Sequence, residues 1–205
     1  MSEKFTLTRG LSNLVIAEVT ADTEEAYTTG TPEKLIPAGE MSVTVDKDKA
    51  QYWFDNTVFA SVGREGASEI TINGAGLRAA AIAKLVGKTV DTTSGAVFDD
   101  GQYKEKYYAL GGIKHNIDGT TEHFWFNKGS FAIPDESAKT EGEDTDATGT
   151  ELTFTAITTI HKFTKTGKVN KRVVLDSSAG NTTDIADWFT EVKTPDNVEG
   201  TVSGS

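Results

Sequence analysis

The clearest signal in this sequence is the regular alternation of apolar and polar side chains. Over residues 40–46, Met41, Val43 and Val45 alternate with polar residues, which is the period-two pattern of a half-buried strand. Residues 69–73 repeat this pattern with isoleucine at every second position. We therefore predict a strand in each segment.

Further strands are predicted on both sides of this pair. Residues 14–19 form a short apolar run, and residues 123–126 place aromatic side chains on both faces. The second pattern is typical of a strand that is covered on both sides or lies at a subunit contact. Residues 150–163 are rich in Thr, Ile and Phe and exceed the usual strand length of ~5–6 residues. We expect this last strand to extend beyond the core.

Helical spacing is found in two segments. Between residues 76 and 86, Leu77, Ala81 and Leu85 are spaced four apart, and Gly87 follows as a natural helix end. The spacing predicts a helix over residues 76–86. A second, shorter helix is predicted over residues 183–192, where apolar side chains mark one face.

Three long connections separate the predicted elements: residues 21–32, 46–66 and 134–149. Long loops inside a compact domain are usually functional or disordered, and their apolar content distinguishes the two cases. The third connection is acidic and almost free of large apolar residues, so we expect it to be mobile. The second is predicted to be an interaction loop because it carries five large apolar side chains: Tyr52, Trp53, Phe54, Val58 and Phe59.

Length and composition favour a single soluble domain. A chain of 205 residues with 37% hydrophobic content can bury one core, and neither an internal repeat nor a linker divides it. The sequence has no cysteine, no apolar run behind the N-terminal charges and no stretch of ~20 apolar residues. The formal net charge of −11 disfavours binding to nucleic acid, because such binding depends on clustered Lys and Arg.

No catalytic, cofactor or metal site is predicted. The three histidines, His115, His123 and His161, lie on or beside predicted strands without an obvious acid, base or ligand set. Asp144 begins a segment that resembles a calcium loop, but Thr155 stands where that loop requires glutamate. Gly111 and Gly112 lack the spacing of a phosphate cradle, and we expect them in a turn.

The order of the elements resembles one known family. An apolar, proline-containing approach at residues 35–39 leads into the first alternating strand, and an aromatic-Asp-Asn element follows at residues 52–56. Residues 65–72 then lead to the predicted helix. The later matching segments are residues 107–111, 121–127, 151–156 and 186–189. Together they cover nearly the whole chain, which resembles the major tail protein family of siphophages that infect Gram-positive bacteria.

This resemblance implies an antiparallel β-sandwich or barrel with one short α-helix packed against it and long loops. It also implies one tail-tube-like domain over residues 1–195, with an N-terminal arm (1–12), an inter-ring loop (46–66) and a flexible C-terminal tail (196–205). In such a fold the five apolar residues of the loop, from Tyr52 to Phe59, would form an inter-subunit contact.

The function that the resemblance implies is structural. Six copies would close into a ring, and stacked rings would form the tail tube of the virion, assembled in the host cytoplasm. The implied partners are other copies, the tape-measure protein, and the distal tail and tail terminator proteins. Genomic DNA would pass through the lumen without specific binding, and no cofactor or membrane is involved. A β-sandwich module that binds carbohydrate or a receptor remains the alternative, and an enzyme is the third possibility.

Overall fold

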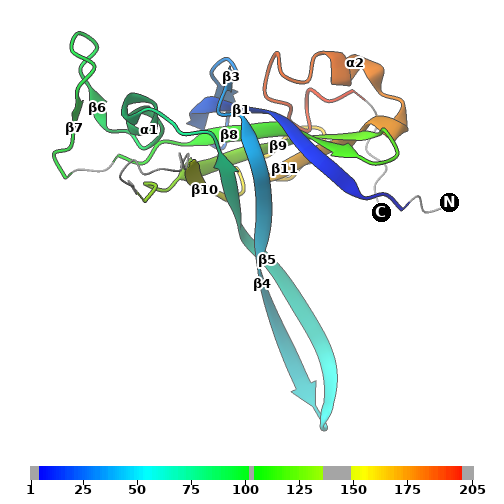
Figure 1. Cartoon of the computed structure of the whole chain (residues 1–205). Helices are drawn as coiled ribbons and strands as arrows, with labels where there is room; N and C mark the ends of the chain where they lie inside the picture. Colours follow the sequence, from blue (N-terminus) through cyan, green and yellow to red (C-terminus); the bar gives the residue numbers. More distant parts are fainter. Residues whose placement is uncertain (1–4, 102–103, 136–148, 200–205) are drawn as a thin grey trace, which may run out of the picture.

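Most strands of the computed structural model belong to one antiparallel sheet. The structure describes residues 5–101, 104–135 and 149–199, and in this part nine strands form the sheet. Its strand order is β2-β1-β8-β9-β10-β5-β4, with β11 beside β9 and β3 beside β1 (Figure 1). β6 and β7 form a separate pair. The prediction of a mainly β, antiparallel fold is confirmed.

The strands are β1 (Thr8–Asp22), β2 (Tyr27–Thr29), β3 (Glu33–Lys34), β4 (Ala38–Phe54), β5 (Thr57–Gly74), β6 (Thr89–Val90), β7 (Val97–Phe98), β8 (Tyr108–Asn116), β9 (Thr121–Phe131), β10 (Thr150–Ala156) and β11 (Arg172–Asp176). The helices are α1 (Ala79–Leu85), the 3-10 turn η1 (Ser177–Ala179) and α2 (Thr182–Ala186).

The centre of the sheet is buried on both faces. Phe124 and Phe126 of β9 pack into the larger core cluster, together with Ile70 and Ile72 of β5 and residues of β1, β8, β10 and α1. On the opposite face, Trp125 packs into a second cluster formed with the segment that follows α2. The aromatic residues predicted on both faces of residues 123–126 are therefore covered on both sides, as the sequence indicated.

Gly111 and Gly112 lie in the middle of β8, so the prediction that they form a turn is wrong. A Cβ at Gly111 would lie 2.7 Å from the ring of Trp125, and one at Gly112 would lie 2.7 Å from Leu14. Large side chains approach the strand backbone on both faces here. Glycine is needed for space rather than for backbone freedom.

Helix α1 begins three residues later than predicted. Arg78 has extended backbone angles, with φ −73° and ψ 148°, and the N–H of Leu77 donates to the Thr150 hydroxyl at 3.1 Å. That bond holds the preceding turn against β10. The predicted end is confirmed, because Gly87 has a φ of +74° and the N–H of Lys88 donates to the Ala83 carbonyl.

Helix α2 is shorter than the predicted helix over residues 183–192. The chain continues after Ala186 in turns, in which Thr190 donates to the Asp187 carbonyl through both its N–H and its hydroxyl. These turns place Trp188 and Val192 in the second cluster, over the sheet. The apolar spacing that predicted a helix reflects burial on this face.

Strand β10 ends at Ala156, so the prediction of one long strand over residues 150–163 is wrong. The carboxylate of Asp22 accepts hydrogen bonds from the N–H groups of Ile160 and His161, at 2.9 to 3.0 Å. It also accepts one from the Lys128 ammonium at 2.6 Å. This buried carboxylate holds residues 160 and 161 away from the ladder, because it satisfies the N–H groups that a continuing strand would pair.

Parts of the expected N-terminal arm (1–12) and of the expected flexible C-terminal tail (196–205) are held in the fold. β1 starts at Thr8, so residues 8–12 of the expected N-terminal arm belong to the sheet. Residues 196–199 of the expected flexible tail are held in place: Asp196 accepts from the N–H groups of Thr164 and Lys165, and the Glu199 N–H donates to Asp184. The acidic segment 136–148, including the resemblance to a calcium loop, lies outside the described residues, as do residues 200–205.

Candidate interaction surface

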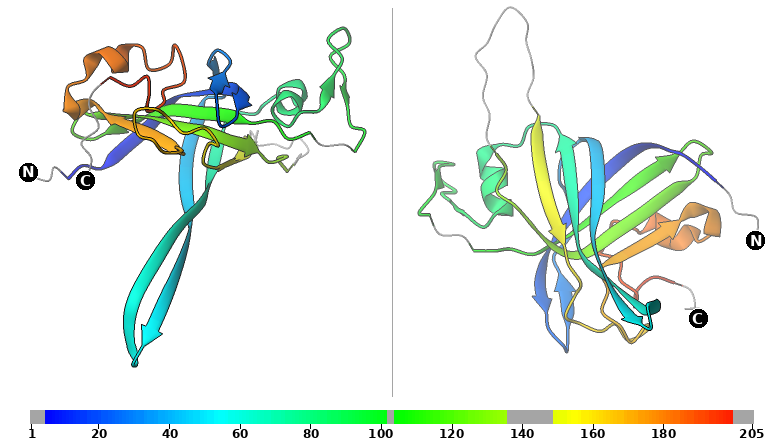
Figure 2. Two further views of the ribbon diagram at one scale, coloured as in Figure 1. Left: turned by 180° about the vertical axis from the view of Figure 1, so that it is seen from behind. Right: turned by 90° about the horizontal axis from the view of Figure 1, so that it is seen from below.

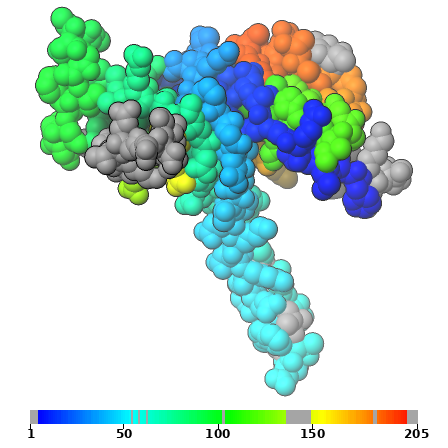
Figure 3. Space-filling model, viewed as in Figure 1, coloured from blue at the N-terminus to red at the C-terminus, as the bar shows by residue number. Residues whose placement is uncertain are grey.

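Strands β4 and β5 continue beyond the rest of the molecule as a two-stranded ribbon, which we call the arm (residues 46–66). Figure 1 shows the arm projecting from the sheet, and Figure 2 shows the same projection from behind. In the space-filling view the arm is a separate rod (Figure 3). About nine residues of β4 lie in it, which corresponds to roughly 30 Å. We call the remainder of the protein the body.

The expected loop over residues 46–66 is therefore strand along almost its whole length. Cross-strand pairs run from Lys47 opposite Glu65 to Phe54 opposite Thr57. The chain reverses at Asp55 and Asn56, which both have left-handed backbone angles with φ of 48° and 63°. These angles define a two-residue turn that matches the twist of the strands. The Asp-Asn pair was the signal in the sequence that could have predicted the hairpin.

The arm has two different faces, because residues that pair across the strands point to the same side. Gln51 pairs with Ser61, and Lys49 pairs with Gly63, which makes this face polar up to the tip, where Trp53 follows on the same side. The other face carries Ala50, and Tyr52 pairs with Ala60 on it. A half-apolar ribbon without a covering layer is unusual, because two strands alone are only marginally stable in water.

The predicted contact residues lie together at the far end of the arm. Tyr52, Trp53 and Phe59 are 54%, 59% and 78% exposed, respectively. Phe54 and Val58 occupy the last rungs of the ladder, where Val58 lies opposite Trp53. The structure thus brings the five residues to one place. Whether they form an inter-subunit contact stays a prediction.

A cation of the body contacts the root of the arm. The Lys171 ammonium, which precedes β11, donates to the Glu65 carboxylate and to the Gly66 carbonyl. The hydrogen bond from Lys171, together with the charges of Lys171 and Lys47, lowers the pKa of Glu65. Lys171 is therefore placed to set the direction in which the arm leaves the body.

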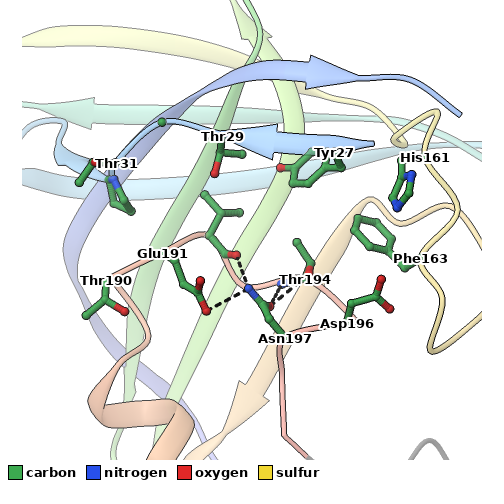
Figure 4. Close-up of a pocket in the computed structure, with 13 residues that line it drawn as sticks. Tyr27, Thr29, Thr31, His161, Phe163, Thr190, Glu191, Thr194, Asp196 and Asn197 are labelled. Atoms are coloured by element: carbon green, nitrogen blue, oxygen red, sulfur yellow. Dashed lines mark hydrogen bonds between the residues drawn. The ribbon is translucent and has the colours of Figure 1, made fainter. Parts of the chain in front are cut away.

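A polar cleft of about 420 Å³ lies on the body, between β2 and the C-terminal segment (Figure 4). Both ends of the Asn197 side-chain amide, which lines this cleft, are hydrogen-bonded. Its oxygen accepts from the Thr194 N–H at 2.6 Å, and its NH2 group donates to the Glu191 carboxylate at 3.1 Å. Tyr27 and Phe163 also line the cleft, and their rings are in edge contact with 5.6 Å between the ring centroids. The Asn197 amide thus bonds to other residues of the cleft, and Asp196 accepts from the N–H groups of Thr164 and Lys165.

The three histidines lie in different surroundings. His123 is buried on the second cluster, in edge contact with Trp188, and burial lowers its pKa, with a smaller contribution from His115. The His115 ring bonds to Ser12 at 2.7 Å, and the His161 ring lies against Phe163. Among the described residues, no three His, Asp or Glu side chains are grouped so that they could hold a metal ion.

The comparisons with known proteins give little further information. No family model matches the chain, and no curated protein matches it. Among solved structures, the chain is similar to the anti-feeding prophage cap, a tube terminating cap studied by cryo-EM, with 8% sequence identity and a TM-score of 0.42. The likeness covers 85% of this chain and 97% of the cap. At this level it carries no argument about function. None of the described helices is long and apolar enough to cross a membrane.

Proposed function

We propose that this protein is a structural subunit of a long-tailed bacteriophage tail tube. Copies assemble into rings of six, and the rings stack into the conduit through which DNA is ejected. The role is structural and not catalytic. Two things support this proposal: the order of sequence elements that resembles the siphophage major tail proteins, and the arm.

The arm is the observation that carries the proposal. Its far end exposes Tyr52 and Trp53 by more than half, on a ribbon that projects away from the body. Burying large aromatic side chains of this kind contributes roughly 1.5–3 kcal/mol each. A second copy of the chain that covered the arm would supply this stabilisation, and repetition of the contact would produce an assembly.

The acidic composition supports a conduit for DNA. A chain with a net charge of −11 repels a polyanion, which shortens the time that DNA spends on the wall of a lumen. On this proposal the other partners are those of a tail: the tape-measure protein, the distal tail and the tail terminator proteins. The assembled protein is part of the virion, and assembly takes place in the cytoplasm of the host.

The second candidate function is a module that binds carbohydrate or a receptor. The polar cleft favours it, because threonine hydroxyls and the rings of Tyr27 and Phe163 line one hollow. The internal bonds of Asn197 and Asp196 count against it, since those groups are not available to a ligand without rearrangement. Trp53 could also serve as a stacking platform for a sugar.

The proposed function is tested by negative-stain electron microscopy of the concentrated protein, with size-exclusion chromatography and light scattering on the same sample. We expect rings or tubes with a central channel. The variant Tyr52→Ala/Trp53→Ala should remain folded by circular dichroism but fail to stack. Its control is Lys49→Ala/Gln51→Ala, which removes two polar side chains lower on the arm, nearer the body, and should assemble normally.

Two outcomes would contradict this proposal. The first is normal tubes from the Tyr52→Ala/Trp53→Ala variant, which would remove the arm from the contact. The second is a wild-type protein that stays monomeric at every concentration. Glycan binding by that monomer in a screen would favour the carbohydrate-binding module instead.

A further inference from the structure

A second group of exposed apolar side chains lies at the N-terminal end of the sheet, and we call it the N-terminal patch (Phe5, Leu7 and Ile117). These side chains are 90%, 70% and 59% exposed. The Ile117 N–H donates to the Leu7 carbonyl at 2.9 Å, so the turn after β8 and the chain before β1 are held side by side. Together with Thr6 and Asp118, they line a hollow of about 310 Å³.

The N-terminal patch and the arm tip (residues 52–59) are far apart in one molecule. Figure 1 places the start of β1 at one end of the sheet and the arm tip at the far end of the ribbon, and Figure 3 shows the same separation on the surface. Most of the strongly exposed large apolar side chains in the described ranges belong to these two groups. Within one molecule, the arm tip therefore cannot contact the N-terminal patch and cover it.

The two surfaces also differ in charge. Between residues 50 and 63 the sequence contains one charged residue, Asp55, which lies in the turn of the arm. Arg9 follows the N-terminal patch on β1, is exposed, and has no ion pair in the described part of the chain. Arg9 and Lys114 line the next hollow along β1, opposite one carboxylate, that of Glu40. The arm tip thus carries one carboxylate, and two cations, Arg9 and Lys114, lie beside the patch, whose own hollow contains the carboxylate of Asp118.

We infer that the arm tip of one copy docks on the N-terminal patch of a second copy, with Trp53 in the hollow and Asp55 beside Arg9. This inference rests on the proposed function, because it names the surfaces through which the copies join. A buried tryptophan is a common anchor of protein interfaces. Its indole N–H also needs an acceptor when it is buried. Asp118 lines the hollow and supplies a carboxylate for this role.

The contact joins two different surfaces, which determines the kind of assembly that it gives. Such a heterologous contact leaves a free arm on one copy and a free patch on the other, so it repeats until a ring closes or a filament forms. The arm extends roughly 30 Å beyond the body, which is enough to reach a neighbouring copy without moving the sheet. The Asp55 and Arg9 pair determines which surfaces match, because like charges placed together are strongly unfavourable.

Charge reversal provides the first test. Asp55→Arg places two cations in contact, and Arg9→Asp places two carboxylates in contact. We expect each single variant to need at least a tenfold higher concentration to assemble, as measured by light scattering. The double variant Asp55→Arg/Arg9→Asp restores the opposite charges and should assemble at the wild-type concentration. The control Glu25→Arg changes an exposed charge in the turn between β1 and β2 and should have no effect.

Cysteine cross-linking provides the second test and maps the contact directly. The chain contains no cysteine, so an introduced pair is the only source of disulfides. The variant Thr6→Cys/Asn56→Cys should form a ladder of dimers, trimers and larger species under mild oxidation. The control Thr93→Cys/Asn56→Cys places one thiol in the turn between β6 and β7 and should not form a ladder.

The outcomes separate the inference from the proposed function. If tubes form, but the double charge reversal does not restore assembly and the Thr6/Asn56 pair gives no ladder, the docking inference is overturned and the tube function stands. If neither wild-type assembly nor a ladder is observed at any concentration, both are overturned. A ladder together with restored assembly supports both.

Discussion

The body and the arm are formed partly by the same two strands, but they are stabilised in different ways. In the body, β5 lies between β4 and β10, and its Ile70 and Ile72 are completely buried. In the arm, β5 pairs with β4 alone, and Tyr52 and Trp53 of β4 are more than half exposed. One strand therefore passes from a three-stranded, covered environment into a two-stranded, uncovered one.

Backbone hydrogen bonds can define the shape of a segment such as the arm without stabilising it strongly. Each backbone bond contributes only about 0.5–1.5 kcal/mol net, because the unfolded chain bonds to water instead. The body adds to these bonds the burial of the aromatic side chains of β9 from both sides. The arm has no such layer in its own chain, and on the proposed function another copy supplies it.

The three tryptophans give the largest test of this comparison. Trp188 is completely buried, and its carbonyl accepts from the indole N–H of Trp125 at 3.0 Å. We expect Trp188→Ala to lower the free energy of unfolding by about 3–5 kcal/mol, through lost burial and the cavity left behind. Trp53→Ala should change it by less than ~0.5 kcal/mol in the monomer. Urea unfolding followed by far-UV circular dichroism measures both.

Equal losses for the two tryptophan variants would break the comparison between body and arm. They would show that the arm is packed against the body in solution. A folded Trp188→Ala variant is not required for this test, because an unfolded one already differs from Trp53→Ala in the expected direction.

Ion pairs give the next test, with a smaller effect. Lys128 and Asp22 bond at 2.6 Å with side chains only 8% and 4% exposed, whereas Lys84 and Glu33 bond at 2.7 Å with about half of each side chain exposed. We expect Asp22→Asn to cost about 3 kcal/mol at neutral pH, because it leaves a buried ammonium without its partner. Glu33→Gln should cost less than ~1 kcal/mol.

The same carboxylate predicts a dependence of stability on pH. Burial raises the pKa of Asp22, but hydrogen bonds from Lys128 and from the N–H groups of His161 and Ile160 outweigh it, and the pKa lies below its ordinary value of 3.8. The stabilisation is thus complete above that value and is lost as the pH falls through the lower, folded pKa. In urea titrations below about pH 4, the free energy of unfolding of Asp22→Asn should therefore fall less with decreasing pH than that of the wild type. An unchanged pH dependence would show that other carboxylates cause the loss of stability in acid.

The body was largely predictable from the sequence because its patterns are local. Alternation in residues 40–46 and 69–73 and the aromatic pattern of β9 each predicted a strand, and all three are strands. Gly87 marked the end of α1. The path of the chain after β10 could not be predicted, because residues 160 and 161 are held by Asp22, more than 130 residues earlier in the chain.

The arm was recognised by its apolar content but not by its structure. Its five large apolar residues were found, yet charged and glycine residues on both flanks concealed the strand pattern. Those residues are tolerated in a strand because the ribbon is solvated and Lys47 lies opposite Glu65. The glycines of β8 were misassigned for the opposite reason. The rings that exclude a Cβ there come from another strand, and no local pattern reveals them.

A matched pair of glycines gives the smallest and most direct comparison of body and arm. At Gly111 a Cβ would lie 2.7 Å from the Trp125 ring, whereas at Gly63 no atom lies within 4 Å. We expect Gly111→Ala to cost about 2 kcal/mol, because the covered sheet cannot move the ring aside cheaply. Gly63→Ala should leave the stability unchanged or raise it by about 0.4–1 kcal/mol, since alanine restricts the unfolded chain.

Urea unfolding of the two glycine variants measures these changes, and the assembly assay then adds a second reading. On the proposed function, Gly63 lies on the polar face of the arm, opposite Lys49, so an added methyl group there should leave tube formation unchanged. A folded Gly63→Ala protein that no longer assembles would show that a neighbouring copy also covers the polar part of the arm between Trp53 and the body. The arm would then be enclosed on both faces, as β9 is in the body, and the contrast between the two regions would hold only for the isolated subunit.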